Sequence, residues 1–146
     1  MRNHNKKLPI SKSILPNIKE SVLLFVDDND LFRSTMTKYM KNRYPSLKIF
    51  EGNCGEKALQ ITKQLIPDLI IIDINMKDMS GLTAISIIKN EYPFIPIIVL
   101  TNHDETEYYE AAKKAQADAF ISKNNILSEL FEIIDELLLN DNELNK

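Results

Sequence analysis

The sequence predicts an α/β fold in which a doubly wound sheet of five parallel strands carries helices on both faces. Two observations support this prediction. Segments of strand character alternate with segments of helical character five times along the chain. Three of the strand segments, residues 22–26, 69–72 and 97–100, are unbroken apolar runs, which is typical of strands that are buried on both faces.

The strands are predicted from short apolar and β-branched runs that stop at polar residues or turns. VLLFV stops at two aspartates, and DLIIID itself ends in an aspartate. LKIFE, PIIVLT and AFIS have the same short, largely apolar character. The predicted strands span residues 22–26, 47–51, 68–73, 96–101 and 119–122.

Each predicted strand is followed by a segment with helical periodicity. In the first of these, Phe32, Met36 and Met40 recur every four residues, which is the spacing of one buried stripe. A proline follows each of the first three helical segments closely and cannot continue the helix. The predicted helices span residues 31–44, 55–65, 81–90, 104–115 and 125–139.

Composition is that of an ordinary globular domain. The chain has 146 residues, of which 44% are hydrophobic and 27% are charged, enough for one sizeable core. Its net charge of −3 argues against direct nucleic-acid binding, and no apolar run approaches the roughly 18 residues of a membrane span. The one cysteine, Cys54, cannot form an internal disulfide, so we expect a cytoplasmic location.

Residues 1–20 differ in character from the rest of the chain. They carry five lysines and arginines, one glutamate and two prolines. We interpret them as a basic N-terminal extension, either a solvated tail or an arm that binds a partner. Residues 21–139 are expected to form one domain, and residues 140–146 a C-terminal tail.

Polar residues lie where four of the predicted strands end. Asp27 and Asp28 follow the first strand, and Asp73 ends the third. Thr101 ends the fourth strand, and Lys123 follows the fifth. Right-handed crossovers bring the carboxyl ends of parallel strands to one edge of the sheet, where ligands bind at the switch point. We therefore expect these side chains to converge.

Each of these residues also has an ordinary structural role open to it. Asp28, Asn29 or Asp30 can cap the first helix, and one of them is expected to do so. The threonine can be a plain strand end, and the lysine a solvated surface residue. Asp73 fits such a role least well, because several residues separate it from the next predicted helix. The arrival of all five at one edge favours a functional site.

The chemistry follows from the residue types. Three carboxylates close together repel one another unless a cation lies among them. Oxygen ligands without histidine or cysteine favour a hard cation, Mg²⁺ first, with Mn²⁺ as a substitute. A lysine and a hydroxyl opposite the cation suit a bound phosphoryl dianion. The pattern predicts phosphoryl transfer, for which a carboxylate can be the nucleophile.

These segments resemble the receiver domain of response regulators, the phosphoacceptor half of two-component signalling. LLFVDDND resembles the family's acidic pair, IIIDINMKDMSG its phosphoacceptor strand and loop, IIVLTN the strand with its switch threonine, and ADAFISK the strand with its lysine. The resemblance covers residues 21–139 and implies a single domain of the flavodoxin-like (βα)5 fold.

The resemblance implies a phosphoacceptor and a set of metal ligands. Asp73 would accept the phosphoryl group from a sensor histidine kinase or a phosphotransfer protein. Asp28, Asp73 and the backbone carbonyl of Asn75 would bind Mg²⁺, and Asp27 would bind it directly or through water.

The resemblance also implies a conformational switch. Lys123 and Thr101 would contact the new phosphoryl oxygens, and Phe120 would rotate into the space that Thr101 leaves. This would reshape the surface formed by the fourth helix, fifth strand and fifth helix, through which a downstream protein or a second copy would bind. The chain would be a stand-alone receiver or the receiver part of a transcriptional regulator.

Two other function classes stay open. Some phosphohydrolases also use an aspartate nucleophile at a strand end, but they need a second acid two residues later, where this chain has Asn75. We therefore expect no enzyme activity on external substrates. The other class is a degenerate receiver that acts as a binding scaffold independently of phosphorylation, against which the presence of all five polar groups argues.

The chain departs from the family pattern at several positions. Lys77 stands where a proline is usual, and Gln116 and Ala119 stand where glycines usually precede the fifth strand. Asn102 follows the threonine where a smaller residue is common. Asn124 replaces a proline, as in the branch whose members often carry a helix-turn-helix output domain.

The last predicted helix has an unusually wide apolar face. Its apolar residues span an arc of roughly 160°, whereas one packed face needs only about 100° or somewhat more. The excess is either a partner surface or the edge of a deeply seated helix. The residues concerned are Ile126, Leu127, Leu130, Phe131, Ile133, Ile134, Leu137 and Leu138.

Overall fold

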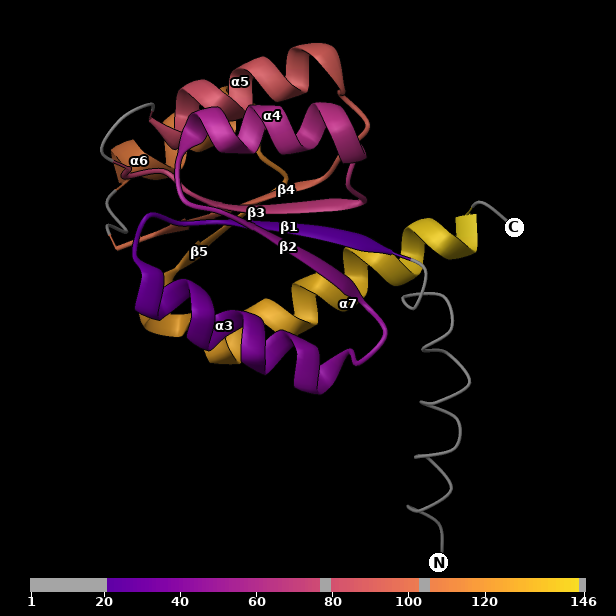
Figure 1. Cartoon of the computed structure of the whole chain (residues 1–146). Helices are drawn as coiled ribbons and strands as arrows, with labels where there is room; N and C mark the ends of the chain where they lie inside the picture. The colour runs from indigo at the N-terminus through magenta and orange to yellow at the C-terminus, as the bar shows by residue number, and fades with distance from the viewer. Residues whose placement is uncertain (1–20, 77–79, 103–105, 145–146) are drawn as a thin grey trace, which may run out of the picture.

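The computed structural model describes residues 21–76, 80–102 and 106–144 (Figure 1). Its strands are β1 (Val22–Val26), β2 (Lys48–Gly52), β3 (Leu69–Asp73), β4 (Ile97–Thr101) and β5 (Ala119–Ser122). Its helices are α3 (Asp30–Arg43), α4 (Gly55–Leu65), α5 (Gly81–Glu91), α6 (Thr106–Lys114) and α7 (Ile126–Leu144), with the 3-10 turn η1 (Lys123–Asn125) before α7.

All strand pairs are parallel, and the strand order is β2-β1-β3-β4-β5. Helices α3 and α7 cover one face of the sheet, and α4, α5 and α6 cover the other (Figure 1). The predicted doubly wound parallel sheet is therefore confirmed. Among the described helices, none is both long enough and apolar enough to cross a membrane.

The three strands predicted from unbroken apolar runs occupy the middle of the sheet. Every residue of β3 and β4 is buried, as are four of the five in β1, whereas most residues of the edge strand β2 are exposed or half-buried. Alternate residues of the central strands feed two apolar cores. Leu23 and Phe25 pack on the side of α3 and α7, and Leu24 and Val26 pack on the opposite side.

The predicted element bounds agree with the structure to within two residues, except at the end of α7. This helix continues to Leu144, into the segment predicted as a tail. Neither proline nor glycine, the two strongest helix breakers, lies in residues 139–144.

The wide apolar face of α7 is mostly seated in the core. Phe131, Ile133 and Leu137 are partly buried and pack against the core on that side, while Leu127 is 56% exposed. These contacts favour the deeply seated helix over a large partner surface.

The turn before β5 takes a left-handed backbone conformation without glycine. Gln116 has a φ of 76°, and its N–H donates to the carbonyl of Lys113 (2.9 Å), closing the end of α6. The departure from the family pattern at this position therefore places a residue with a β-carbon in a conformation that costs about 1–2 kcal/mol.

Helix α5 begins directly against the backbone that follows β3. Gly81 is buried, and its N–H donates to the carbonyl of Ile74 (3.3 Å). A β-carbon at Gly81 would overlap the carbonyl oxygen of Asp73 and lie 2.6 Å from the Cα of Ile74. Only glycine lets the helix approach this closely.

We expect Gln116→Gly to raise the free energy of unfolding by about 0.5–1 kcal/mol, because glycine relieves the left-handed strain but gains entropy when unfolded. Ala119→Gly is the matched control: it lies in β5, where glycine should lower that free energy by about 0.5–1 kcal/mol. Urea unfolding measures both. A loss of stability in Gln116→Gly would contradict the strain.

We expect Gly81→Ala to lower the free energy of unfolding by about 1–3 kcal/mol or more, since the added methyl group must displace backbone. Gly52→Ala is the control, because its β-carbon would meet no heavy atom closer than 3.6 Å and should be tolerated. Urea unfolding measures both variants. Equal losses of stability in the two would contradict the close approach of Gly81 to the backbone of Asp73 and Ile74.

Candidate functional site

The register of the sheet places the acidic residues side by side. The strand order changes direction between β1 and β3, which is the switch point where sheets of this kind bind ligands. Val26 of β1 pairs with Ile72 of β3, so Asp27 and Asp73 each lie one residue further at the same level. Asp28 follows directly in the loop that leads to α3.

The same register brings in the threonine and the lysine. Asp73 pairs with Leu100 of β4, so Thr101 lies one residue beyond the level of Asp73. Thr101 in turn pairs with Ser122 of β5, and Lys123 follows Ser122. The five polar residues predicted from the sequence therefore lie at one edge of the sheet.

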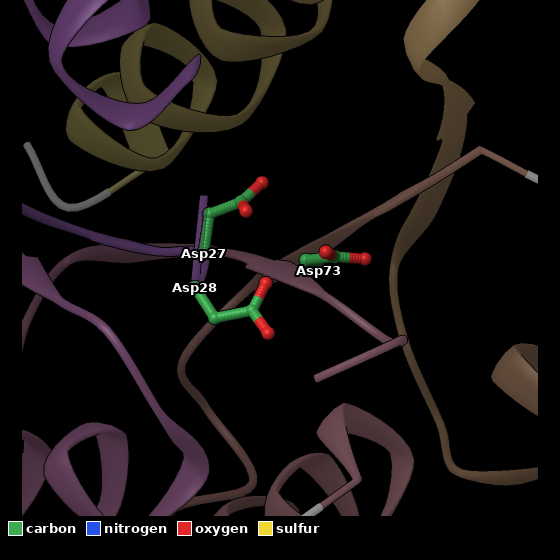
Figure 2. A group of neighbouring side chains, drawn as sticks. All are labelled: Asp27, Asp28 and Asp73. Atoms are coloured by element: carbon green, nitrogen blue, oxygen red, sulfur yellow. The ribbon is translucent and has the colours of Figure 1, made fainter. Parts of the chain in front are cut away.

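The three carboxylates form one cluster. One oxygen from each of Asp27, Asp28 and Asp73 lies within 4.8 Å of the other two. Asp27 is fully buried and Asp73 is 3% exposed, whereas Asp28 is half-buried. Asp27 and Asp28 project on opposite sides of the end of β1, with Asp73 beside them (Figure 2).

Lys123 is part of this cluster rather than a solvated surface residue. Its side chain is 11% exposed, and its Nζ lies 2.8 Å from Asp27 Oδ2 and 3.4 Å from Asp73 Oδ2. The ammonium also lies 4.3 Å from the centre of the Phe32 ring, close enough for a cation–π interaction. With all three carboxylates ionised, these carboxylates and the Lys123 ammonium together carry a net charge of −2.

Backbone N–H groups fix the orientation of two of the carboxylates. Asn29 N–H donates to Asp27 Oδ1 (2.9 Å), and Asn75 N–H donates to Asp73 Oδ1 (3.0 Å). Asp73 therefore also has a structural role, because its carboxylate closes a local turn with the backbone N–H two residues later. Asn29 caps α3 by accepting from Phe32 N–H (2.9 Å), which confirms the expectation of a cap in this segment.

Burial raises the pKa of Asp73, and the nearby charge of Asp27 raises it further. The hydrogen bond from Asn75 N–H and the charge of Lys123 act in the opposite direction but do not cancel the effect of burial. The folded chain therefore holds Asp73 in an environment that disfavours its negative charge.

The residues fit a divalent cation. The donor set is entirely oxygen, which suits a hard cation such as Mg²⁺. Asp27 Oδ2 is buried and lies 2.8 Å from the Lys123 ammonium. A cation of charge +2 would balance the net charge of −2 on the three carboxylates and Lys123.

Thr101 and Phe120 share one face of the sheet. Thr101 is fully buried, and its cross-strand neighbour in β5 is Ser122. Phe120 lies two residues before Ser122 in the same strand, so the side chains of Thr101 and Phe120 point to the same side of the sheet. The Phe120 ring is half-buried and meets the Tyr109 ring of α6 edge to face, with centroids 5.5 Å apart. Tyr109 is 45% exposed, so this pair connects the site to the surface.

One residue that contacts the site at this edge is not among the site residues predicted from the sequence. Arg33 of α3 donates from Nη1 to the backbone carbonyl of Asp27 (2.6 Å), from Nε to Glu51 (2.9 Å) and from Nη2 to Asp30 (2.8 Å). Its spacing of three residues from Asp30 is the one available sequence signal, because such pairs lie on one helix face.

The family model of the response regulator receiver domain matches residues 23–135. Among curated proteins, the response regulator protein VraR of Staphylococcus saprophyticus is 30% identical over 119 residues, which cover 82% of this chain and 57% of VraR. VraR of Staphylococcus aureus is 30% identical over 112 residues, covering 77% of this chain and 54% of that protein. The chain thus spans about half the length of the curated relatives it matches.

Solved structures have the same fold. A DNA-binding response regulator of the LuxR family from Staphylococcus aureus superposes with a TM-score of 0.74 at 25% identity, covering 80% of this chain and 98% of that one. A CheY-like response regulator receiver domain protein from Methanospirillum hungatei gives a TM-score of 0.77 at 21% identity, covering 86% and 98%.

We expect Asp73→Asn to stabilise the fold at neutral pH without Mg²⁺, by on the order of 1 kcal/mol, because it removes a buried negative charge. The raised pKa of Asp73 lowers the stability of the wild type as the pH rises from the ordinary value of 3.8 through the raised one. The advantage of the variant should therefore disappear below pH 3.8.

Urea unfolding of both proteins at neutral pH and at about pH 3.5 measures this difference. A variant that is less stable than the wild type at neutral pH, or whose advantage persists unchanged in acid, would contradict the electrostatic explanation.

Proposed function

Since the chain belongs to the response regulator receiver domain family, we propose that it is a phosphorylation-controlled signalling module in which Asp73 is the phosphoacceptor. The phosphoryl group would come from a sensor histidine kinase or a phosphotransfer protein. The observation that carries the proposal is the convergence of three carboxylates within 4.8 Å, with the ammonium of Lys123 3.4 Å from Asp73.

Asp73 has the position of a nucleophile. An oxygen of its carboxylate would form a bond to phosphorus while the P–N bond of the donor phosphohistidine breaks, and the histidine nitrogen would keep the electron pair of that bond. The hydrogen bond from Asn75 N–H holds the carboxylate at the end of β3, so the attacking group is oriented before the donor arrives.

The acidic cluster would hold Mg²⁺, or Mn²⁺ in its place. Asp28, Asp73 and the backbone carbonyl of Asn75 are the proposed protein ligands, with Asp27 binding directly or through water. When bound, the ion supplies charge neutralisation for the phosphoryl oxygens. The oxygen-only donor set and the net charge of −2 on the three carboxylates and Lys123 support this assignment.

Lys123 and Thr101 would contact the oxygens of the phosphoryl group on Asp73. The Lys123 ammonium already contacts Asp73, so a phosphoryl group on that carboxylate would lie within its reach. The Thr101 side chain would turn towards the phosphoryl oxygens, and Phe120, on the same face, would follow into the space released. This is a two-state equilibrium that phosphorylation biases.

The output surface would be the face formed by α6, β5 and α7. Phe120 and Tyr109 meet there, in a hollow that Lys113 also lines. A change of the Phe120 rotamer would alter this hollow directly. A downstream protein or a second copy of the chain is the proposed partner on this face. The chain would act as a stand-alone receiver or, as the names of its relatives favour, as the receiver part of a transcriptional regulator.

The proposal is tested by intact mass spectrometry after incubation with Mg²⁺ and acetyl phosphate. We expect the wild type to gain one phosphoryl group, Asp73→Asn to gain none, and removal of Mg²⁺ by a chelator to prevent the gain. Asp68→Asn is the matched control, because Asp68 lies just before the opposite end of β3, where Asn can still accept the hydrogen bond from Val22 N–H.

A gain in Asp73→Asn equal to that of the wild type would exclude Asp73 as the acceptor. A wild type that binds Mg²⁺ but is phosphorylated neither by acetyl phosphate nor by a histidine kinase would favour the degenerate receiver that acts only as a scaffold.

A further inference from the structure

Arg33 connects the acidic pair to two other parts of the chain. Its side chain is only 14% exposed, although it lies in the first turns of α3. The guanidinium donates to the Asp27 carbonyl (2.6 Å), to Glu51 in β2 (2.9 Å) and to Asp30 in its own helix (2.8 Å). Three acceptors from three segments thus surround one planar group, a geometry that arginine alone among the side chains offers.

The contact with Asp27 is made by the backbone just beyond β1. Asp27 N–H still bonds to the carbonyl of Gly52 in β2 (3.1 Å), but β1 ends at Val26. The carbonyl of Asp27 therefore lies past the end of the strand, and Arg33 supplies a donor to it.

This contact acts on Asp28 through the peptide plane. A peptide group is planar, so an oxygen held in place fixes the plane that contains the next nitrogen and Cα. The peptide between Asp27 and Asp28 carries the oxygen that Arg33 holds. Arg33 thus restricts the direction in which the Asp28 side chain leaves the backbone.

A cation beside a metal site would normally repel the metal. Here the charge of Arg33 is outweighed by Asp30 and Glu51, whose carboxylates lie 2.8 and 2.9 Å from the guanidinium. The three groups together carry a net charge of −1. Arg33 can therefore hold the backbone of the acidic pair without opposing a divalent cation.

We propose that Arg33 is a positioning residue that holds the Asp27–Asp28 peptide so that the acidic pair is arranged to bind Mg²⁺. The inference rests on the proposed function, since it concerns the metal site of the phosphoacceptor. It goes beyond that function by assigning a role to a residue that contacts the backbone of the site and not its carboxylates.

The test is a titration of the full chain with Mg²⁺ alone, measured by isothermal titration calorimetry. We expect Arg33→Lys and Arg33→Ala each to weaken Mg²⁺ binding about tenfold, the effect typical of groups that orient metal ligands. Lysine keeps the charge but cannot hold three acceptors in one plane, so the loss in Arg33→Lys reports geometry and not charge.

Arg43→Lys is the matched control. Arg43 lies at the other end of α3 and makes a comparable ion pair, with Asp135 at 3.0 Å, away from the acidic cluster. It should lose stability without a change in Mg²⁺ affinity. Thermal unfolding of every variant, run in parallel, ensures that the titrations compare folded proteins.

A second readout separates binding from turnover. The rate of phosphorylation by acetyl phosphate should approach the wild-type rate in Arg33→Lys at saturating Mg²⁺, while the Mg²⁺ concentration for half the maximal rate rises about tenfold.

Wild-type Mg²⁺ affinity in Arg33→Lys would overturn the inference, as would an equal loss of affinity in Arg43→Lys. A wild type that does not bind Mg²⁺ at all would overturn the metal site and the proposed function with it. The failure of the inference alone is therefore distinguishable from the failure of both.

Discussion

The mutual repulsion of three carboxylates at the end of β1 and β3 is the constraint on which this edge of the sheet depends. Asp27 and Asp73 are almost completely buried, where ionised carboxylates are stable only when other groups compensate their charge. Lys123 and two backbone N–H groups provide part of that compensation. The three carboxylates and Lys123 keep a net charge of −2, which fits the divalent cation proposed to bind beside the phosphoryl group.

The rest of the fold holds this cluster in place. The fully buried strands β3 and β4, with β1 beside them, set the levels of the polar residues through their register. Gly81 lets α5 start against the backbone of Asp73. The first turns of α3 support both halves of the site: Phe32 lies beneath the Lys123 ammonium, and Arg33 holds the carbonyl of Asp27. One helix thus contacts both the residues proposed to bind the cation and the lysine proposed to contact the phosphoryl group.

The departures from the family pattern that lie in the described residues leave the site intact. Gln116 adopts the left-handed backbone that a glycine would favour, so the turn keeps its shape and loses only stability. Asn102 is exposed next to the buried Thr101, and Asn124 donates its N–H to Ser122 (3.2 Å) at the start of η1. Lys77 lies outside the described residues. Changes in a turn are tolerated here because the side chains of the site are carried by strand ends.

The sequence by itself determined the parallel sheet and the five polar residues of the site, because unbroken apolar runs mark central strands and one crossover rule sends their carboxyl ends to one edge. Only the tertiary structure decided what surrounds those residues. The partner of Arg33 in β2 lies 18 residues away in the chain, and Phe32 meets Lys123 from a distant helix. Such contacts leave no local pattern in the sequence, because they depend on how the helices pack on the sheet and not on the periodicity of any one segment.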